Sequence, residues 1–118
     1  MLSKTVKIGD KEVTFKSSAA IPRMYRIKFG RDIFKDLTKL EKTYKDKGDG
    51  TVDMEIEDLE IFENVAYIMA LHADHESTPK EIGEWLDQFE MFSIYEILPE
   101  ILELWGSNLF TDVNAKKN

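Results

Sequence analysis

Residues 72–76 (His-Ala-Asp-His-Glu) bring two imidazoles and two carboxylates together. These are the donor types of a zinc site or an acid/base pair, but a zinc site needs at least three well-oriented protein ligands. The cluster falls where a predicted helix breaks, which leaves its geometry poorly fixed. His72 also continues the apolar stripe of that helix, near a C-terminus whose dipole favours an imidazolium. We therefore expect the cluster to be structural, with a metal-dependent enzyme as the weakest alternative.

A second segment, 45–56, resembles the calcium-binding loop of an EF-hand. With Gly50 at loop position 6, Asp49 and Asp53 fall at positions 5 and 9. Such a loop also needs oxygen ligands at positions 1, 3 and 12. Those positions hold Lys45, Lys47 and Ile56. Two cations and an aliphatic side chain do not bind calcium, so the sequence favours a plain loop between two helices.

Catalytic motifs are missing from the sequence. There is no nucleophile elbow, Ser–His–Asp order, phosphate-binding loop or dinucleotide fingerprint. The chain contains no cysteine, which excludes a disulfide, a thiol nucleophile and a thiolate metal site. We predict a protein that is not an enzyme and that uses no cofactor and no metal.

Large aromatic side chains are concentrated in the C-terminal third. At helical spacing such residues usually form a core, but Trp and Tyr are also typical anchors of partner surfaces. Both interpretations are open, and we take these residues as candidates for partner binding. They are Trp85, Phe89, Phe92, Tyr95, Trp105 and Phe110. Trp105 and Phe110 are the foremost, because they follow the helix interruption expected at Pro99.

Charge is divided unevenly along the chain, whose net charge is −7. Residues 1–45 carry 12 Lys or Arg against 5 Asp or Glu, whereas residues 46–118 carry 4 against 18. This asymmetry is compatible with a solvated surface, with orientation against a charged partner, or with head-to-tail self-association into a homo-oligomer. The cations form no run and have few stacking aromatics among them, so we do not expect nucleic-acid binding.

The elements that position these residues begin with a hairpin. Residues 5–16 alternate polar and apolar side chains around Gly9-Asp10, which predicts two short strands. A helix from about residue 20 to 29 should follow, with Pro22 in its first turn and Gly30 ending it. Asp32 can then cap a second helix, whose apolar stripe is formed by Ile33, Leu37, Leu40 and Tyr44.

The second half of the chain is predicted to be helical as well. Residues 53–72 have a broad apolar stripe, typical of a helix covered on more than one side. Thr78, Pro79 and Glu81 form a capping-box pattern before a helix that reaches Phe89. In the last helix, Pro99 should introduce a kink or mark the true start.

At 118 residues, with 42% hydrophobic and 33% charged side chains, the chain fits one domain, residues 1–118. The predicted fold is mainly α, of the α+β class, with a short N-terminal β-hairpin (5–16) packed on four or five helices (18–110). Residues 111–118 should form a flexible tail. With no apolar run of membrane-spanning or signal-peptide length, a cytosolic protein without membrane contact is expected.

Three segments together resemble tail assembly chaperones of long-tailed phages and prophages of Gram-positive bacteria. They are residues 25–33 (Tyr-Arg-Ile-Lys-Phe-Gly-Arg-Asp-Ile), residues 84–87 (Glu-Trp-Leu-Asp) and residues 94–105 at the predicted closing helix. The resemblance covers about residues 5–110, and its motifs are structural rather than catalytic.

This resemblance implies a small helical protein in the host cytoplasm that binds the long, helical tape measure protein. It would keep that protein soluble until tail tube subunits polymerise, and would be absent from the mature virion. The tail tube protein is a further candidate partner. The alternative from another functional class is an acidic regulatory or DNA-mimic protein that occupies a basic site on a host factor.

Overall fold

The computed structural model describes residues 2–47, 56–90 and 93–104. It opens with an antiparallel pair, β1 (Leu2–Ile8) and β2 (Lys11–Ser17), in a register that runs from Leu2↔Ser17 to Ile8↔Lys11. Gly9 turns the chain with a φ of 63°, a conformation that a glycine adopts without strain. The predicted hairpin is confirmed, and it extends three residues further at its start and one at its end.

One face of the hairpin is apolar and packs on the helices. Ile8 and Phe15 are buried, and Val6 and Val13, which face each other across the two strands, pack against the core. Thr5 and Thr14 pair on the exposed face, with 2.8 Å between their hydroxyl oxygens. A lone hairpin is marginal in water, so this buried face is what anchors it.

Helices α1 (Ile21–Phe29) and α2 (Ile33–Lys47) meet at a sharp corner. Pro22 lies in the first turn of α1, and Gly30 ends that helix with a φ of 67°, its N–H donating to the Arg26 carbonyl. Asp32 then caps α2, because its Oδ1 accepts the backbone N–H of Phe34 at 2.9 Å. Both predicted helix boundaries at this corner are confirmed.

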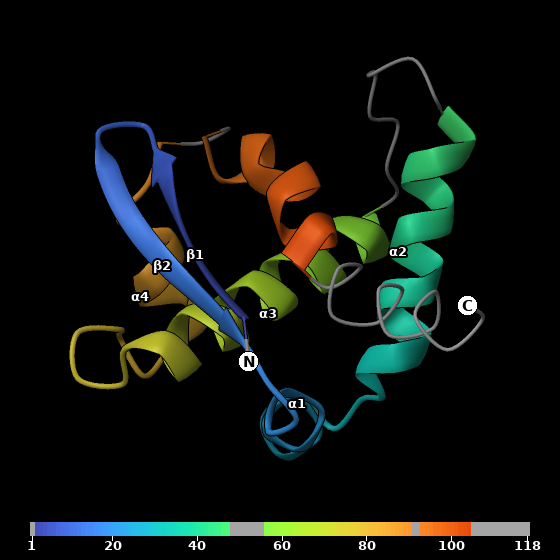
Figure 1. Ribbon diagram of the computed structural model, residues 1–118, viewed down its shortest axis with the longest axis horizontal. Coiled ribbons are helices and arrows are strands. Elements are labelled where there is room, and N and C mark those ends of the chain that lie inside the picture. Colours follow the sequence, from blue (N-terminus) through green and yellow to red (C-terminus); the bar gives the residue numbers. More distant parts are fainter. Residues whose placement is uncertain (1, 48–55, 91–92, 105–118) are drawn as a thin grey trace, which may run out of the picture.

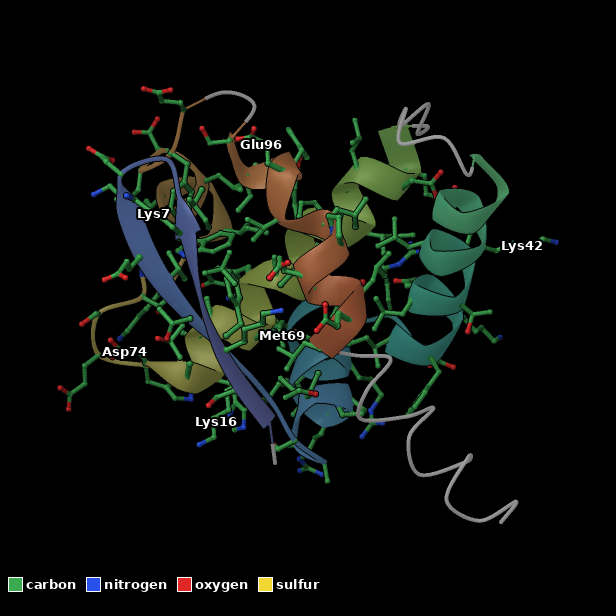
Figure 2. All side chains as sticks on the ribbon, turned by 45° about the horizontal axis from the view of Figure 1, so that its top comes forward. Lys7, Lys16, Lys42, Met69, Asp74 and Glu96 are labelled. Carbon is green, nitrogen blue, oxygen red and sulfur yellow. The ribbon has the colours of Figure 1, made fainter. Side chains whose placement is uncertain are left out.

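Helix α3 (Ile56–Ala73) runs through the centre of the molecule (Figure 1). The hairpin covers one side of it, α2 lies along another, and α1 crosses below. Figure 2 places Met69 in this interior. The breadth of the predicted stripe is explained, since α3 is buried on nearly all sides in its middle. The buried apolar residues of α3 are Ile61, Phe62, Val65, Ala66, Tyr67, Ile68, Met69 and Ala70.

Two short elements complete the described chain, α4 (Ile82–Leu86) and the 3₁₀ helix η1 (Ser93–Ile97), which continues into α-helical residues 98–104. Pro99 therefore lies in the first turn of the α-helical part, where its missing N–H costs nothing. The predicted α+β fold, a β-hairpin packed on helices, is confirmed. The predicted tail, 111–118, lies outside the described residues.

The predicted capping box before α4 is wrong. Glu81 is the N-cap residue of α4, and no side chain caps this helix. The Thr78 hydroxyl donates instead to the Ala70 carbonyl of α3 at 3.3 Å, and the Pro79 carbonyl accepts a hydrogen bond from the Tyr67 hydroxyl. The residues that looked like a helix start hold the loop against α3.

Candidate partner-binding surfaces

The 72–76 cluster serves the structure around the end of α3. His72 Nε2 lies 2.8 Å from the Ser18 hydroxyl, which joins α3 to the segment between β2 and α1. Asp74 Oδ1 accepts the backbone N–H of Ser77 at 3.1 Å. Among the described residues, no group of three His, Asp or Glu side chains is arranged to hold a metal ion. Most of the EF-hand-like segment lies outside the described residues.

The environment of His72 favours the neutral imidazole. Burial lowers the pKa of His72 below its ordinary value, and the nearby Lys16 and His75 lower it further. This direction is opposite to the effect expected from the dipole of α3. A neutral ring suits a hydrogen bond with a serine hydroxyl. We therefore interpret the Ser18–His72 pair as a structural link between α3 and the segment that precedes α1.

The predicted aromatic residues do not share one environment. Trp85 is 3% exposed and belongs to the core. Its ring makes edge contacts with three others, at centroid distances of 6.5 Å to Phe15, 5.6 Å to Tyr67 and 5.1 Å to Phe89. Burial favours the core interpretation for Trp85, whereas Phe89 is half-buried at the edge of the same cluster.

Tyr95 lies against a different part of α3. Its ring packs on Phe62 with centroids 5.9 Å apart, and its hydroxyl donates to Glu63 Oε2 at 2.6 Å. That hydrogen bond, together with burial, raises the pKa of Tyr95 to about 12. Tyr95 remains half-buried. Three other members of the predicted set lie outside the described residues: Phe92, Trp105 and Phe110.

A buried polar cluster holds the corner between α1 and α2. Arg31 donates two hydrogen bonds to Asp36, from Nε to Oδ2 at 2.7 Å and from Nη2 to Oδ1 at 2.9 Å. The Tyr25 hydroxyl donates to the same Oδ2 at 2.7 Å. Tyr25 is fully buried and Asp36 is 6% exposed. A bidentate guanidinium pair of this kind fixes both distance and orientation.

The pKa values at the corner follow from these contacts. Burial alone would raise the pKa of Asp36, but the hydrogen bonds from Arg31 and Tyr25 outweigh it and hold the pKa below its ordinary value. Burial, and then the hydrogen bond to Asp36, raise the pKa of Tyr25. The cluster is therefore a carboxylate with two donors across the neutral pH range.

Ion pairs tie this corner to the start of α3. Arg31 Nη2 lies 3.6 Å from a Glu57 carboxylate oxygen, and Lys39 Nζ lies 3.0 Å from the other. Lys39 Nζ also lies 3.4 Å from Oδ1 of Asp58, which is buried. Cations of the basic half of the chain thus pair with carboxylates of the acidic half inside one molecule.

The corner is built from residues 25–33, one of the segments that carry the resemblance. Beyond the polar cluster, Phe29 packs on Tyr25 with ring centroids 5.1 Å apart. Lys28 Nζ donates to the Lys80 carbonyl at 3.0 Å and lies 5.5 Å from the centre of the Tyr67 ring. Most of the segment therefore has a structural role.

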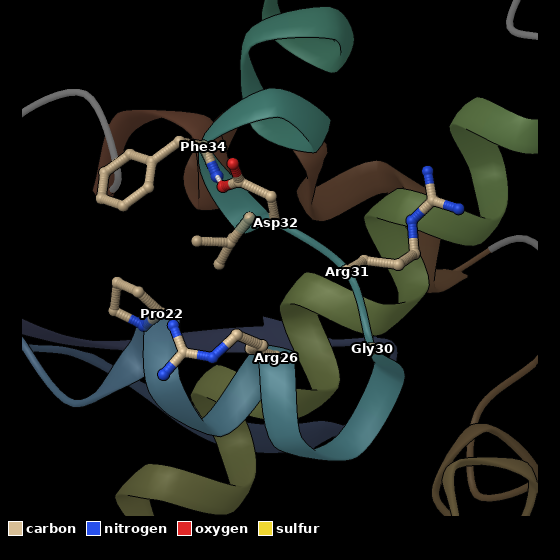
Figure 3. Close-up of a pocket in the computed structure, with 7 residues that line it drawn as sticks. Pro22, Arg26, Gly30, Arg31, Asp32 and Phe34 are labelled. Atoms are coloured by element: carbon tan, nitrogen blue, oxygen red, sulfur yellow. Dashed lines mark hydrogen bonds between the residues drawn. The ribbon is translucent and has the colours of Figure 1, made fainter.

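A pocket of about 390 Å³ opens between α1 and the start of α2 (Figure 3). Pro22 and Arg26 border it from α1 and Phe34 from α2, while the Arg31 side chain turns away toward its carboxylate partners. We call this the corner pocket. The residues that line it are Pro22, Arg26, Gly30, Arg31, Asp32, Ile33 and Phe34.

A second, shallower hollow of about 490 Å³ follows the exposed side of α2 and shares Phe34 with the corner pocket. We call this the α2 face; its residues are Phe34, Lys35, Thr38, Lys39 and Lys42. Phe34 is 49% exposed, and the other exposed large apolar side chain of the described residues is Ile27, at 70%. Lys42 projects outward from α2 (Figure 2).

This surface was not predicted from the sequence, although one signal pointed to it. Phe34 follows Ile33 directly and so lies about 100° around the helix from the stripe that continues through Leu37. An aromatic residue off the buried stripe of an amphipathic helix has to face solvent or a partner.

No protein-family model, no curated protein sequence and no solved structure matches this chain. The resemblance to tail assembly chaperones therefore stays a prediction. No helix in the part of the chain that the structure describes has both the length and the apolar character needed to cross a bilayer.

Proposed function

We propose that this protein is a non-enzymatic chaperone of phage tail assembly. In this proposal it binds the tape measure protein in the host cytoplasm, keeps it soluble until the tail tube protein polymerises around it, and is absent from the mature virion. The proposal rests on the resemblance to tail assembly chaperones, and the observation compatible with it is the structure of residues 25–33, the first segment of that resemblance. The segment folds as one unit, with an αL glycine at Gly30, an N-cap at Asp32 and a bidentate pair from Arg31.

The distribution of exposed side chains is compatible with holding a client. A holding surface needs apolar contact area with a charged rim, which keeps the free chaperone soluble. Phe34 stands among lysines on the α2 face. Near α4, the half-buried Phe89 lies among exposed acids, including Asp87 and Glu90. Of the predicted partner-binding residues that the structure describes, Phe89 and Tyr95 are half-buried, whereas Trp85 is buried.

The alternative of an acidic DNA mimic has less support. Such a mimic needs free carboxylates in rows spaced like phosphates. Within the described part of the acidic half, four carboxylates already pair with cations of the same chain: Glu57, Asp58, Glu100 and Glu103. These ion pairs neutralise part of the negative charge that a DNA mimic would need on its surface.

Co-expression tests the proposal. The neighbouring genes should include a tail tube gene and a very long, helical reading frame, and the product of the latter is the client to use. We expect this client to be insoluble alone, soluble with the chaperone, and recovered with it by pull-down. A client that stays insoluble and forms no complex would contradict the proposal. Capture of a host nucleic-acid-binding protein at a basic site would instead support the mimic.

A further inference from the structure

Among the described residues, the α2 face and the corner pocket hold cations that take part in no ion pair. Lys39 is paired with Glu57 and Asp58, but no ion pair within residues 2–47, 56–90 and 93–104 involves Arg26, Lys35 or Lys42. Among the described residues that line the corner pocket, Asp32 is the only carboxylate, and it accepts the N–H of Phe34 at the start of α2. The surface lies in the basic half of the chain, although the net charge of the whole chain is −7.

The geometry of the face suits a helix. Phe34, Thr38 and Lys42 recur every four residues, so they form a line that covers about 12 Å along α2 and is inclined by about 26° to its axis. Lys35 and Lys39 form a second line beside it. The groove between the two lines can accept a side-chain ridge of another helix. The corner pocket continues the line beyond Phe34 and offers room for one large apolar side chain.

The same residues define the chemistry of the occupant. Phe34 and the aliphatic stems of the lysines favour apolar side chains, and the ammonium groups at the rim favour carboxylates on either side of them. A nucleic acid fits less well, because the surface has little stacking area and the net negative charge of the chain opposes long-range attraction to phosphates.

We infer that the α2 face and the corner pocket together bind an acidic amphipathic helix of a partner protein. Its apolar side chains lie against Phe34 and enter the corner pocket, and its Glu and Asp side chains pair with Arg26, Lys35 and Lys42. Under the proposed function, on which this assignment of the partner rests, the helix is a segment of the tape measure protein.

A designed peptide of about 20 residues tests the surface directly. The peptide carries Leu along one face and Glu on both flanks, with a fluorescent label, and binding to the full chain is followed by anisotropy. Two control peptides have Lys in place of Glu, or the same composition in scrambled order. We expect binding of the first peptide alone, weakening as added salt screens the contact.

Matched variants locate the binding site. Lys35→Glu with Lys42→Glu should weaken binding by about tenfold or more. The control pair, Lys7→Glu with Lys11→Glu, makes the same charge change on the exposed hairpin and should leave binding unchanged. Phe34→Ala should also weaken binding by about tenfold. Ile27→Ala removes a similar exposed side chain that lines neither hollow, and should have no effect.

Several results would overturn the inference. The first is equal binding of the acidic and the Lys-bearing peptide. The second is an equal loss of peptide affinity in the α2 and the hairpin charge variants. The third is tighter binding of a single-stranded oligonucleotide than of the acidic peptide. A wild-type oligomer that dissociates in the Lys35→Glu/Lys42→Glu variant would assign the face to a second copy of this chain, and would overturn the inference too. Circular dichroism of each variant checks that the fold is intact.

Co-expression of the same variants separates this inference from the proposed function. If wild type and the Lys35→Glu/Lys42→Glu variant both keep the tape measure protein soluble, the chaperone function stands and the inferred site is wrong. If the peptide binds at the α2 face but the client stays insoluble, the surface stands and the proposed function fails.

Discussion

The α1–α2 corner and the α4 region are held together by different kinds of interaction. At the corner, the directional hydrogen bonds of Arg31 and Tyr25 converge on the buried Asp36 carboxylate. Around α4, Trp85 is equally buried but is surrounded by aromatic rings. The corner depends on the ionisation of one carboxylate and the presence of both partners, whereas the α4 region depends on volume and contact area.

The polar cluster of the corner and the aromatic cluster around α4 should therefore respond differently to substitution. Removing one partner of a buried charge pair leaves the other with an uncompensated desolvation cost. Removing a ring leaves a cavity, and its cost depends on how far the surroundings collapse. A change of pH should therefore affect the corner and leave the α4 region unaffected.

The largest effect is expected from Trp85→Ala. The ring fills the space between the hairpin, α3 and α4, and its loss should lower the free energy of unfolding by about 3–5 kcal/mol. Urea denaturation measures this loss. Phe89→Ala, at the half-buried edge of the same cluster, should cost clearly less. Equal losses from the two variants would mean that Trp85 is not the centre of this region.

The next effect is that of Arg31→Gln, which removes the cation from Asp36. A fully buried pair loses about 3–5 kcal/mol when it is broken, but the Arg31 side chain is 42% exposed, so we expect about 2 kcal/mol. Arg26→Gln, on the same corner but in no ion pair with the residues that the structure describes, should stay within about 0.5 kcal/mol of wild type. Indistinguishable unfolding midpoints for the two variants would show that the bidentate pair adds nothing to stability.

The pH dependence of the corner follows from the lowered pKa of Asp36. A carboxyl whose pKa is lower in the folded state stabilises the fold above its unfolded value of about 3.9, and that stability is lost as the pH falls through the folded value. The gap in stability between wild type and Arg31→Gln should thus close in acid. The gap between wild type and Trp85→Ala should persist over the same range, as long as both chains remain folded. If the free energy of unfolding changed with pH in parallel for all three proteins, the attribution of the pH dependence to Asp36 would be contradicted.

Local signals at the corner were sufficient to predict its backbone. Gly30 and Asp32 act through their own neighbours, in an αL turn and an N-cap, so a sequence pattern captures them. The partner of Arg31 was not predictable, because nothing in the pattern says that Asp36 turns inward. The exposed position of Phe34 had a local signal, its place off the buried stripe of α2, but the pockets beside it depend on how α1 and α2 meet.

In the α4 region, by contrast, the local sequence signals predicted the wrong helix start. Thr78 and Pro79 match a helix-start pattern. Their polar groups form hydrogen bonds with α3 instead of capping α4. Helix α4 is then only five residues long, since burial of Trp85 rather than capping decides where it lies. Of the six aromatic candidates, the sequence could not separate core from surface, because that division depends on tertiary packing.

The smallest effect is expected at Lys4, where the basic hairpin meets the acidic C-terminal helix. Lys4 Nζ lies 2.8 Å from Glu100 and 3.5 Å from Glu103, but these side chains are 32%, 38% and 66% exposed. Exposed pairs contribute about 0.2–1 kcal/mol and are screened by salt. A double-mutant cycle of Lys4→Gln with Glu100→Gln should give a coupling energy of about 0.5 kcal/mol at low salt that shrinks as salt is added. Lys7→Gln with Glu100→Gln serves as the control and should show no coupling. A Lys4 coupling as large as the loss in Arg31→Gln would mean that surface charge pairing, and not the buried corner alone, joins the two oppositely charged halves of the chain.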